Sequence, residues 1–316
     1  MIILITGAAG NLGTQLTRYL IPSGDALRLL VHRKEPAPEI LSSPNVTVLK
    51  GNLADREFLM KACEGVDCIV HLAGVLFKPR PERFLPVTNT LYVKNLVDAA
   101  LRTAVRRIIL VSFPHVEGET TPAVPARGVL NASPNAIHSR TRLDAEKYLF
   151  EASMGTRMEA VVLRAGVIYG KNIKLIEAAR SLLRKRMLAI WKTPTWLHLL
   201  AIQDFLKALD IAIRAEGIAG IYNVCDDEPV VLQDFLDRLA DHWGYPKPPR
   251  MPDFVFYWAA AWCQTGALIF RTSAPLTRDI VTMGMTSVVA DTSRMKKELL
   301  PALSFPTFRE GIAVID

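Results

Sequence analysis

The stretch TGAAGNLG, Thr6–Gly13, follows the apolar run IILIT at residues 2–6 and opens a segment with helical periodicity. Its glycines, Gly7, Gly10 and Gly13, recur at every third position. Glycine lets the chain turn tightly, brings backbone N–H groups near a pyrophosphate and lets the following helix approach the strand. The stretch therefore predicts a strand, a turn and a helix whose N-terminus faces the diphosphate of a dinucleotide.

Apolar β-branched runs alternate with helical segments through the first 165 residues. Such runs suit parallel strands in a sheet that is covered on both faces. The predicted strands are IILIT at 2–6, ALRLLV at 26–31, VTVLK at 46–50, CIVHLA at 68–73, RIILVS at 107–112 and AVVLRA at 160–165, and the predicted helices include 11–20 and 87–103. We expect an α/β fold, a doubly wound parallel sheet of the Rossmann type, over residues 1–165.

The alternation loosens after residue 165. A basic helix around 176–188, a tryptophan-containing loop, a helix at 203–215 and the strand GIYNV at 220–224 precede a mostly helical tail. We expect residues 166–316 to form a smaller, discontinuous substrate lobe, with segments near 198–224 returning to the Rossmann domain. The proline-rich YPKPPRMP at 245–252 predicts a rigid connector.

Charge and cysteine content bear on which partners, metals and compartments are expected for this chain. The chain has 316 residues and a formal net charge of +7, and its Lys and Arg residues are dispersed apart from a short cluster at 180–186. We expect no nucleic-acid partner, because an anionic small ligand fits this charge at least as well. The four cysteines lie far apart or in apolar contexts, without metal-ligand spacing, which favours a reducing, cytoplasmic location and no metal site. We also expect no secretory signal, since Met1 runs directly into an apolar stretch.

The segment FVFYWAAAWCQTGALIF, Phe254–Phe270, is uncharged and lies at the lower length limit of a membrane-spanning helix. Alanine, glycine, Gln264 and Thr265 reduce its hydrophobicity. We favour a helix that lines an apolar pocket or the core, and keep contact with a membrane surface as the alternative. The aromatic residues of this half favour an apolar or aromatic small-molecule substrate. They are Trp191, Trp196, Phe254, Phe256, Tyr257, Trp258, Trp262 and Phe270.

The glycine spacing and several later motifs resemble the extended short-chain dehydrogenase/reductase family, also called the epimerase/dehydratase family. The further motifs are GNLAD at 51–55, DCIVHLAG at 67–74, NTLYVKNLVDAA at 89–100, LVS at 110–112, LRAGVIYG at 163–170 and YNVCDDEPVVLQDF at 222–235. The resemblance spans nearly the whole chain and suggests a homodimer through the helices at 87–103 and 138–153. It places a nicotinamide dinucleotide against Gly7, Ala9, Gly10, Asn11, Leu12, Gly13, His32, Arg33, Asn52, Leu53, Leu72, Ala73, Gly74, Asn89, Ser112, Arg142, Ala165 and Val167.

The end of the second predicted strand bears on which dinucleotide binds. An acidic residue there would bind the ribose 2′-hydroxyl of NAD. This chain instead reads LVHRK, with His32, Arg33 and Lys34, and has no carboxylate before Glu35. A guanidinium matches the 2′-phosphate of NADP in charge and geometry, so we favour NADP(H) over NAD(H).

The acid/base positions of the family are altered. The resemblance implies a tyrosine and a lysine four residues apart on one helix face, where this chain has His138 and Arg142. No tyrosine in the chain has a lysine four residues later. Arginine stays cationic and could bind ribose hydroxyls. Histidine, with an unperturbed pKa of about 6.5, could donate a proton, although the neighbouring arginine should lower its pKa.

The loop after the fifth strand supplies further candidates. Ser112 comes early in VSFPHVEG, and Pro114 or His115 takes the place of the family's serine, depending on the alignment. His115 and Glu117 are candidate general acids or solvated loop residues. The catalytic candidates are thus His138, Arg142, His115 and Ser112.

We favour an atypical NADPH-dependent oxidoreductase that reduces an apolar carbonyl or unsaturated small molecule. One alternative is a protein that binds NADP(H) without turnover and serves as a sensor, assembly subunit or scaffold. The other is a non-redox lyase, cyclase or isomerase that uses the same pocket.

Overall fold

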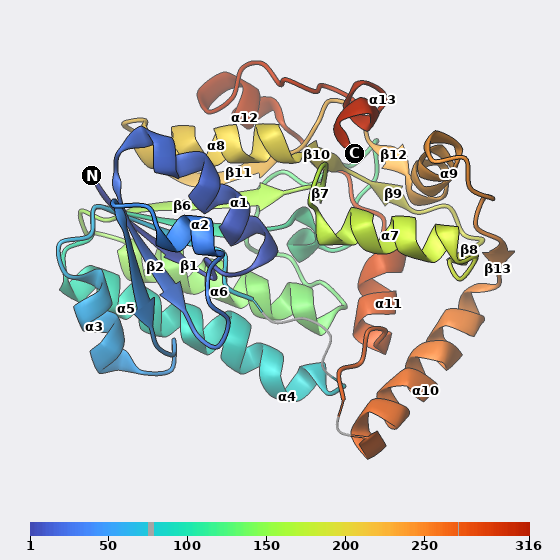
Figure 1. Ribbon diagram of the computed structural model, residues 1–316, viewed down its shortest axis with the longest axis horizontal. Helices are drawn as coiled ribbons and strands as arrows, with labels where there is room; N and C mark the ends of the chain where they lie inside the picture. Colours follow the sequence, from blue (N-terminus) through green and yellow to red (C-terminus); the bar gives the residue numbers. More distant parts are fainter. Residues whose placement is uncertain (75–78, 271) are drawn as a thin grey trace.

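Seven parallel strands form the central sheet of the computed structural model, which describes residues 1–74, 79–270 and 272–316 (Figure 1). Their spatial order is β11-β6-β5-β4-β1-β2-β3. Their bounds are Ile2–Thr6 (β1), Ala26–Val31 (β2), Val46–Lys50 (β3), Cys68–His71 (β4), Arg107–Ser112 (β5), Glu159–Ala165 (β6) and Gly220–Val224 (β11). The α/β doubly wound fold predicted from the sequence is confirmed.

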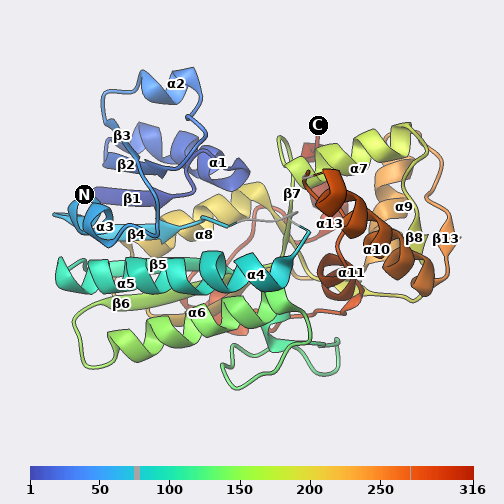
Figure 2. The same cartoon turned by 90° about the horizontal axis from the view of Figure 1, so that it is seen from below.

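Helices cover both faces of this sheet (Figures 1 and 2). One face carries α1 (Asn11–Leu20), η1 (Ile21–Ser23), α2 (Pro38–Leu41) and α8 (Ile202–Arg214); the other carries α3 (Arg56–Cys63), α4 (Pro81–Leu85), α5 (Tyr92–Arg102) and α6 (Ile137–Ser153). Each face has its own core. Leu16 and Phe205 are buried in the first, and Leu59, Leu96 and Leu149 in the second.

The strand order reverses between β1 and β4. The chain runs from β1 outward through β2 and β3, then returns to place β4 on the other side of β1, so that Thr6 pairs with His71 at the carboxyl ends of the two strands. In open parallel sheets, ligands bind outside the carboxyl ends of the strands at such a reversal. The turn at Gly7 therefore opens into the expected crevice.

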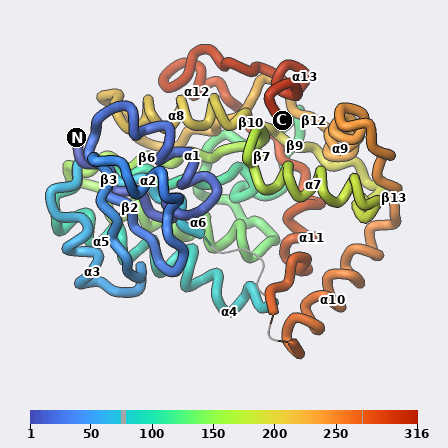
Figure 3. The backbone as a smooth tube through the Cα atoms, in the orientation of Figure 1, coloured from blue at the N-terminus to red at the C-terminus, as the bar shows by residue number. Residues whose placement is uncertain are grey.

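A smaller lobe stands beside the carboxyl ends of the strands, and the tube in Figure 3 shows the chain entering it after β6 and returning through α8 to β11. Its helices are α7 (Lys174–Arg184), α9 (Leu232–His242), α10 (Asp253–Phe270), α11 (Arg278–Met285) and α13 (Phe308–Gly311), followed by η4 (Ile312–Val314). Three two-stranded sheets lie among the segments of this lobe. They pair β7 (Val167–Tyr169) with β10 (Leu199–Ala201), β8 (Ile190–Trp191) with β13 (Arg250–Met251), and β9 (Trp196–Leu197) with β12 (Val230–Val231). Helix α12 (Ser293–Glu298) returns to β11.

Several predicted elements differ from the structure in detail, and the helix expected around 176–188 is α7, which ends at Arg184. The helix expected at 87–103 is divided into a π-helical segment, η2 (Pro86–Leu91), and α5. The strand expected to reach residue 73 ends at His71, because the chain leaves the sheet there and runs along the crevice.

The prediction that residues 254–270 line a pocket or the core is wrong for most of their aromatic side chains. Helix α10 buries only Ala260 and Ala267, whereas Phe254, Trp258 and Trp262 are exposed. Within the part of the chain that the structure describes, no helix combines the length and the apolar character needed to cross a bilayer.

Candidate active site

The turn between β1 and α1 packs so closely at its glycines that no side chain fits there. Gly7 has φ +71°, and a Cβ added there would lie 2.7 Å from the backbone nitrogen of Ala73. A Cβ on Gly13 would lie 2.3 Å from the carbonyl oxygen of Gly7. Gly10 begins α1 without a side-chain cap, so the first N–H groups of the helix are available to an anion at the crevice.

Two adjoining cavities extend from this turn and share Gly7, Gly10, Leu72 and Gly74. The first, about 370 Å³, runs along the ends of β2 and β3. The second, about 450 Å³, runs toward α6. Of the eighteen residues predicted to contact a dinucleotide, all but Asn89 and Val167 line one of the two cavities. Asn89 is buried and donates to the Thr141 hydroxyl.

The far end of the first cavity is cationic. His32, Arg33 and Lys34 line it at the end of β2, and all three are exposed. The nearest carboxylate in the chain, Glu35, forms an ion pair with Lys50 at 3.1 Å. Among the described residues Arg33 has no ion-pair partner, which leaves its guanidinium free for a ligand anion.

Helix α6 presents His138, Arg142 and Glu146 at every fourth position, so the three share one face. His138 is only 7% exposed and stacks on Phe113, with ring centroids 5.2 Å apart. Burial, reinforced by the charge of Arg142, lowers the pKa of His138 to about 3. The imidazole is therefore neutral near neutral pH and can donate an N–H hydrogen bond but not act as an imidazolium acid.

Arg142 is a buried cation with weak protein contacts. Its guanidinium donates to the carbonyl oxygens of Ala73 at 3.4 Å and Val111 at 3.5 Å, and its Nε has no partner among the described residues. Burial lowers the pKa of Arg142 to about 10, with Glu146 opposing the shift. The side chain thus stays charged at neutral pH and retains donors for a ligand in the second cavity.

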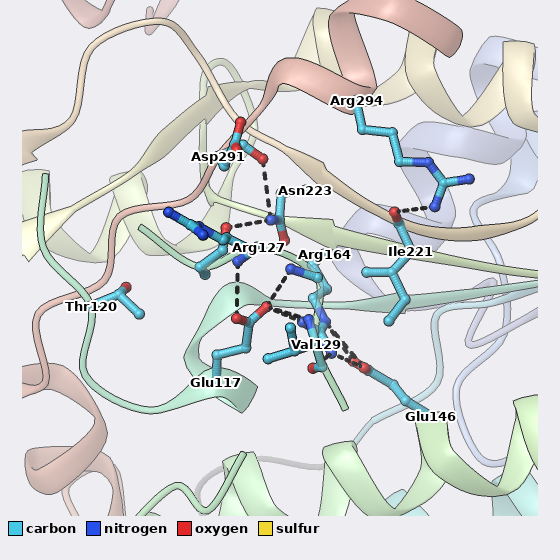
Figure 4. A network of polar contacts seen from close by, with 12 residues as sticks. Glu117, Thr120, Arg127, Val129, Glu146, Arg164, Ile221, Asn223, Asp291 and Arg294 are labelled. Atoms are coloured by element: carbon cyan, nitrogen blue, oxygen red, sulfur yellow. Dashed lines mark hydrogen bonds and ion pairs between the residues drawn. The ribbon is translucent and has the colours of Figure 1, made fainter. Parts of the chain in front are cut away.

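A buried ion network fixes this face of α6 to the sheet (Figure 4). Arg164 on β6 is fully buried and pairs with Glu146 at 2.6 Å and with Glu117 on η3 (Pro114–Glu117). Glu117 also accepts from the backbone N–H groups of Gly128 at 2.7 Å and Val129 at 3.1 Å. The network therefore holds the 127–129 loop against β6, and Glu117 is a structural group whose oxygens are already occupied.

The N-terminus of α6 is tied to the small lobe. Asp279 of α11 accepts from the backbone N–H groups of Ile137 at 2.6 Å and His138 at 3.2 Å. A carboxylate in this position satisfies otherwise unpaired N–H groups and the positive end of the helix dipole. His138 consequently lies where the Rossmann domain and the small lobe meet.

The remaining predicted site residues lie in different surroundings. Ser112 is buried, lines the second cavity and lies beside Glu146. His115 instead lines a separate cavity of about 140 Å³ with Glu119 and Met283. His115 lines neither of the two joined cavities, so the structure gives its predicted catalytic role no support.

Asn11 lines the second cavity, but both ends of its side-chain amide are used. Its Nδ2 donates to the Asn172 carbonyl at 2.7 Å and its Oδ1 accepts from the Lys174 N–H at 3.0 Å. The side chain joins the β1–α1 turn to the start of α7, so we assign it a structural contribution.

Sequence reasoning missed several residues that line the cavities. Thr88 and Tyr92 border the first cavity, and their spacing of four within the helix predicted at 87–103 could have indicated them. Phe113 borders the second cavity and stacks on His138, and no local pattern signals this contact. None of the aromatic residues predicted to wall the ligand pocket lines either cavity.

Comparison with known proteins identifies relatives of this fold. The model of the NAD dependent epimerase/dehydratase family matches residues 3–225. DesIV, a dTDP-glucose 4,6-dehydratase from Streptomyces venezuelae solved with NAD and TYD, is 18% identical with a TM-score of 0.80, covering 100% of this chain and 95% of its own. MoeE5, solved with UDP-glucuronic acid and NAD, is 18% identical with a TM-score of 0.78, covering 99% and 97%. The gox2253 protein is 23% identical with a TM-score of 0.74, covering 99% and 97%.

Proposed function

Because the chain belongs to the NAD dependent epimerase/dehydratase family, we propose that it is an NADP(H)-dependent reductase of an apolar carbonyl compound. The observation that carries the proposal is the pair of joined cavities. They connect a cationic strand end, with Arg33, to a buried imidazole and guanidinium, His138 and Arg142. A dinucleotide phosphate would bind at the first end and a reacting oxygen at the second.

The residues present fit a dinucleotide with a 2′-phosphate. The side-chain-free turn at Gly7 and the uncapped start of α1 suit a diphosphate, and the unpaired Arg33 suits the additional phosphate group. Arg142, with an unpartnered buried Nε, would hold ribose or substrate oxygens. When bound, the nicotinamide supplies the hydride.

His138 and Arg142 would stabilise the oxygen that gains negative charge as the carbonyl carbon is reduced. The neutral His138 ring can donate one hydrogen bond, as a neutral imidazole does when its pKa is lowered, and Arg142 contributes a fixed cation. Since the pKa of His138 is about 3, the proton that completes the alcohol would come from water. This changes the expectation that His138 itself transfers the proton.

The lining of the second cavity favours an apolar substrate. Phe113, Ile168, Ile173 and Leu175 line it, and Arg142 is its one cation among the described residues. The basic helix α7 does not add charge here: its Arg180 pairs with Asp316 at 2.9 Å and lies over the Trp243 ring. A substrate diphosphate would therefore find a single cation.

The proposal is tested with the purified protein in two assays: NADPH oxidation is followed with apolar ketones and enones, and coenzyme reduction and sugar products are followed with NADP⁺ and UDP-glucose or dTDP-glucose. We expect turnover of an apolar carbonyl compound and a fall in kcat of about 10²-fold in His138→Ala and in Arg142→Ala. His242→Ala, at a partly exposed histidine paired with Asp316, is the matched control and should be unaffected. The kcat profile should show no inflection at about pH 6.5.

Three outcomes would overturn the proposal in different ways. Turnover of the nucleotide sugars alone would replace the substrate class. Tight NADPH binding without any turnover would favour the sensor or scaffold alternative. Turnover that survives loss of both His138 and Arg142 would remove their assigned role.

A further inference from the structure

The outer face of α10 is an uncovered aromatic stripe. Phe254, Trp258 and Trp262 follow one another at every fourth position and are 63%, 66% and 73% exposed. Ile269, seven residues after Trp262, is 69% exposed and falls on the same face. Figure 1 shows α10 at the margin of the small lobe, with α11 on its inner side.

The opposite face of α10 is already covered. Ala260 and Ala267 are buried, Phe256 packs edge-on against Trp191 with ring centroids 5.5 Å apart, and Gln264 donates to the Pro79 carbonyl at 2.9 Å. A surface helix normally turns charged residues outward, whereas a helix that is apolar on all sides is covered on all sides. The outer stripe therefore needs a partner that is itself apolar.

Exposed cations lie near α10, one beside its start and two on the side that Gln264 faces. Exposed Lys192 donates its backbone N–H to the carbonyl of Met251, two residues before α10, at 3.0 Å. Exposed Arg278 donates to Gln264 at 3.2 Å, and exposed Arg80 directly follows Pro79. None of these three cations has an ion pair within the described ranges. The helix carries one acidic residue, Asp253 at the first turn, so the charge of the three cations beside α10 complements an anionic surface.

We propose that α10 docks this protein on the surface of an anionic lipid bilayer. The helix would lie in the plane of the interface, with its aromatic stripe among the acyl chains and the cations beside it at the lipid phosphates. Tryptophan suits this depth because its ring is apolar and its indole N–H is polar. The docking is peripheral, because no helix within the described residues is fit to span a bilayer.

The size of the stripe favours a membrane over a second copy of the chain. An α-helix rises about 1.5 Å per residue and is about 10 Å wide, so the 18 residues of α10 present roughly 270 Å². A stable protein interface buries about 800 Å² on each partner. A bilayer surface has no such requirement, since insertion of one apolar helix face and a few charge contacts suffice.

The test is flotation of the purified 316-residue protein with phosphatidylcholine vesicles that either contain or lack phosphatidylglycerol. We expect binding to the anionic vesicles, weakened by salt. The double variant Trp258→Ser, Trp262→Ser should lower the partition coefficient by about tenfold or more, and Lys192→Glu by about fivefold or more. Met154→Ser, which removes a 79% exposed apolar side chain at the end of α6, is the matched control and should not change it.

A second readout separates docking from self-association. On binding, the fluorescence of Trp258 and Trp262 should shift to the blue and be quenched by lipids brominated near the headgroup. The proposal is overturned if the wild type does not float with anionic vesicles. It is also overturned if sedimentation without lipid shows dimers that the double tryptophan variant abolishes while vesicle binding is unchanged.

Discussion

Two regions of the candidate active site are built differently: the β1–α1 turn, here called the backbone end, and the face of α6, here called the side-chain end. At the β1–α1 turn the site consists of backbone, and the steric space at Gly7 and Gly13 admits nothing larger than hydrogen. Along α6 it consists of side chains, and their state depends on burial and on a distant partner, Arg164. A single methyl group added at Gly7 should therefore disrupt the backbone end. The side-chain end should be disrupted by loss of the charge of Arg164, which lies outside α6.

Removing the buried cation of the side-chain end should have the largest effect. Arg164→Met would leave Glu146 and Glu117 without their cation inside the protein, which should lower the free energy of unfolding by about 3–5 kcal/mol. Arg18→Met, at an exposed ion pair with Glu39, is the matched control and should cost less than about 1 kcal/mol. Urea denaturation measures both, and equal losses would show that the network does not hold the α6 face.

Adding a methyl group at the backbone end should have the next largest effect. Gly7→Ala combines a positive φ with a clash against Ala73, so it should lower the free energy of unfolding by about 2–4 kcal/mol. Gly24 has a similar φ of +77° but nothing within 4 Å of an added Cβ. Gly24→Ala should therefore cost only about 1 kcal/mol. If thermal or urea unfolding gives the same loss for both, close packing at the turn is not the constraint.

A smaller effect should appear in the pH dependence of stability. Burial lowers the pKa of His71 and His138 to about 3, and of His115 and His198 to about 4. An unfolded chain, whose histidines have pKa values of about 6.5, binds more protons than the native state below that pH, so stability should fall from about pH 6.5 toward pH 4. Asp226 opposes this trend. Burial raises its pKa to about 9, so its own contribution to stability increases as the pH falls.

Substituting His138 isolates its share of this effect. His138→Gln should reduce the loss of unfolding free energy between about pH 7 and pH 5 by about 1–2 kcal/mol, because one buried neutral imidazole is gone. Urea titrations of wild type and variant at the two pH values provide the comparison. A pH dependence that the variant leaves unchanged would mean that the pKa of His138 is the same in the folded and the unfolded protein.

The backbone end was predictable from sequence because its requirements are local. The glycines of TGAAGNLG, the apolar run before them and the amphipathic helix after them depend only on neighbours along the chain. The basic end of β2, with Arg33, could also be identified by position, and the structure places it on the first cavity. These two sequence patterns predict structure reliably because a strand end and the turn after it have few alternative conformations.

The side-chain end and the small lobe depend on contacts that sequence spacing does not reveal. Glu117 looked like a candidate acid until Arg164 and the 127–129 backbone were seen to occupy it. The stack of Phe113 on His138 joins residues 25 positions apart. Helix α10 was expected to be covered because it is apolar, but composition does not say which elements are near enough to cover Trp258 and Trp262.

Calorimetric titration with NADPH and NADH tests the central claim most directly, namely that the joined cavities hold a dinucleotide with its 2′-phosphate against Arg33. We predict that NADPH binds more tightly than NADH by about tenfold or more. Arg33→Ala should remove most of that preference, whereas Lys61→Ala, at an exposed lysine of α3 outside both cavities, should leave it unchanged. Absence of binding to either coenzyme, or equal affinity for both that Arg33→Ala does not alter, would contradict the account.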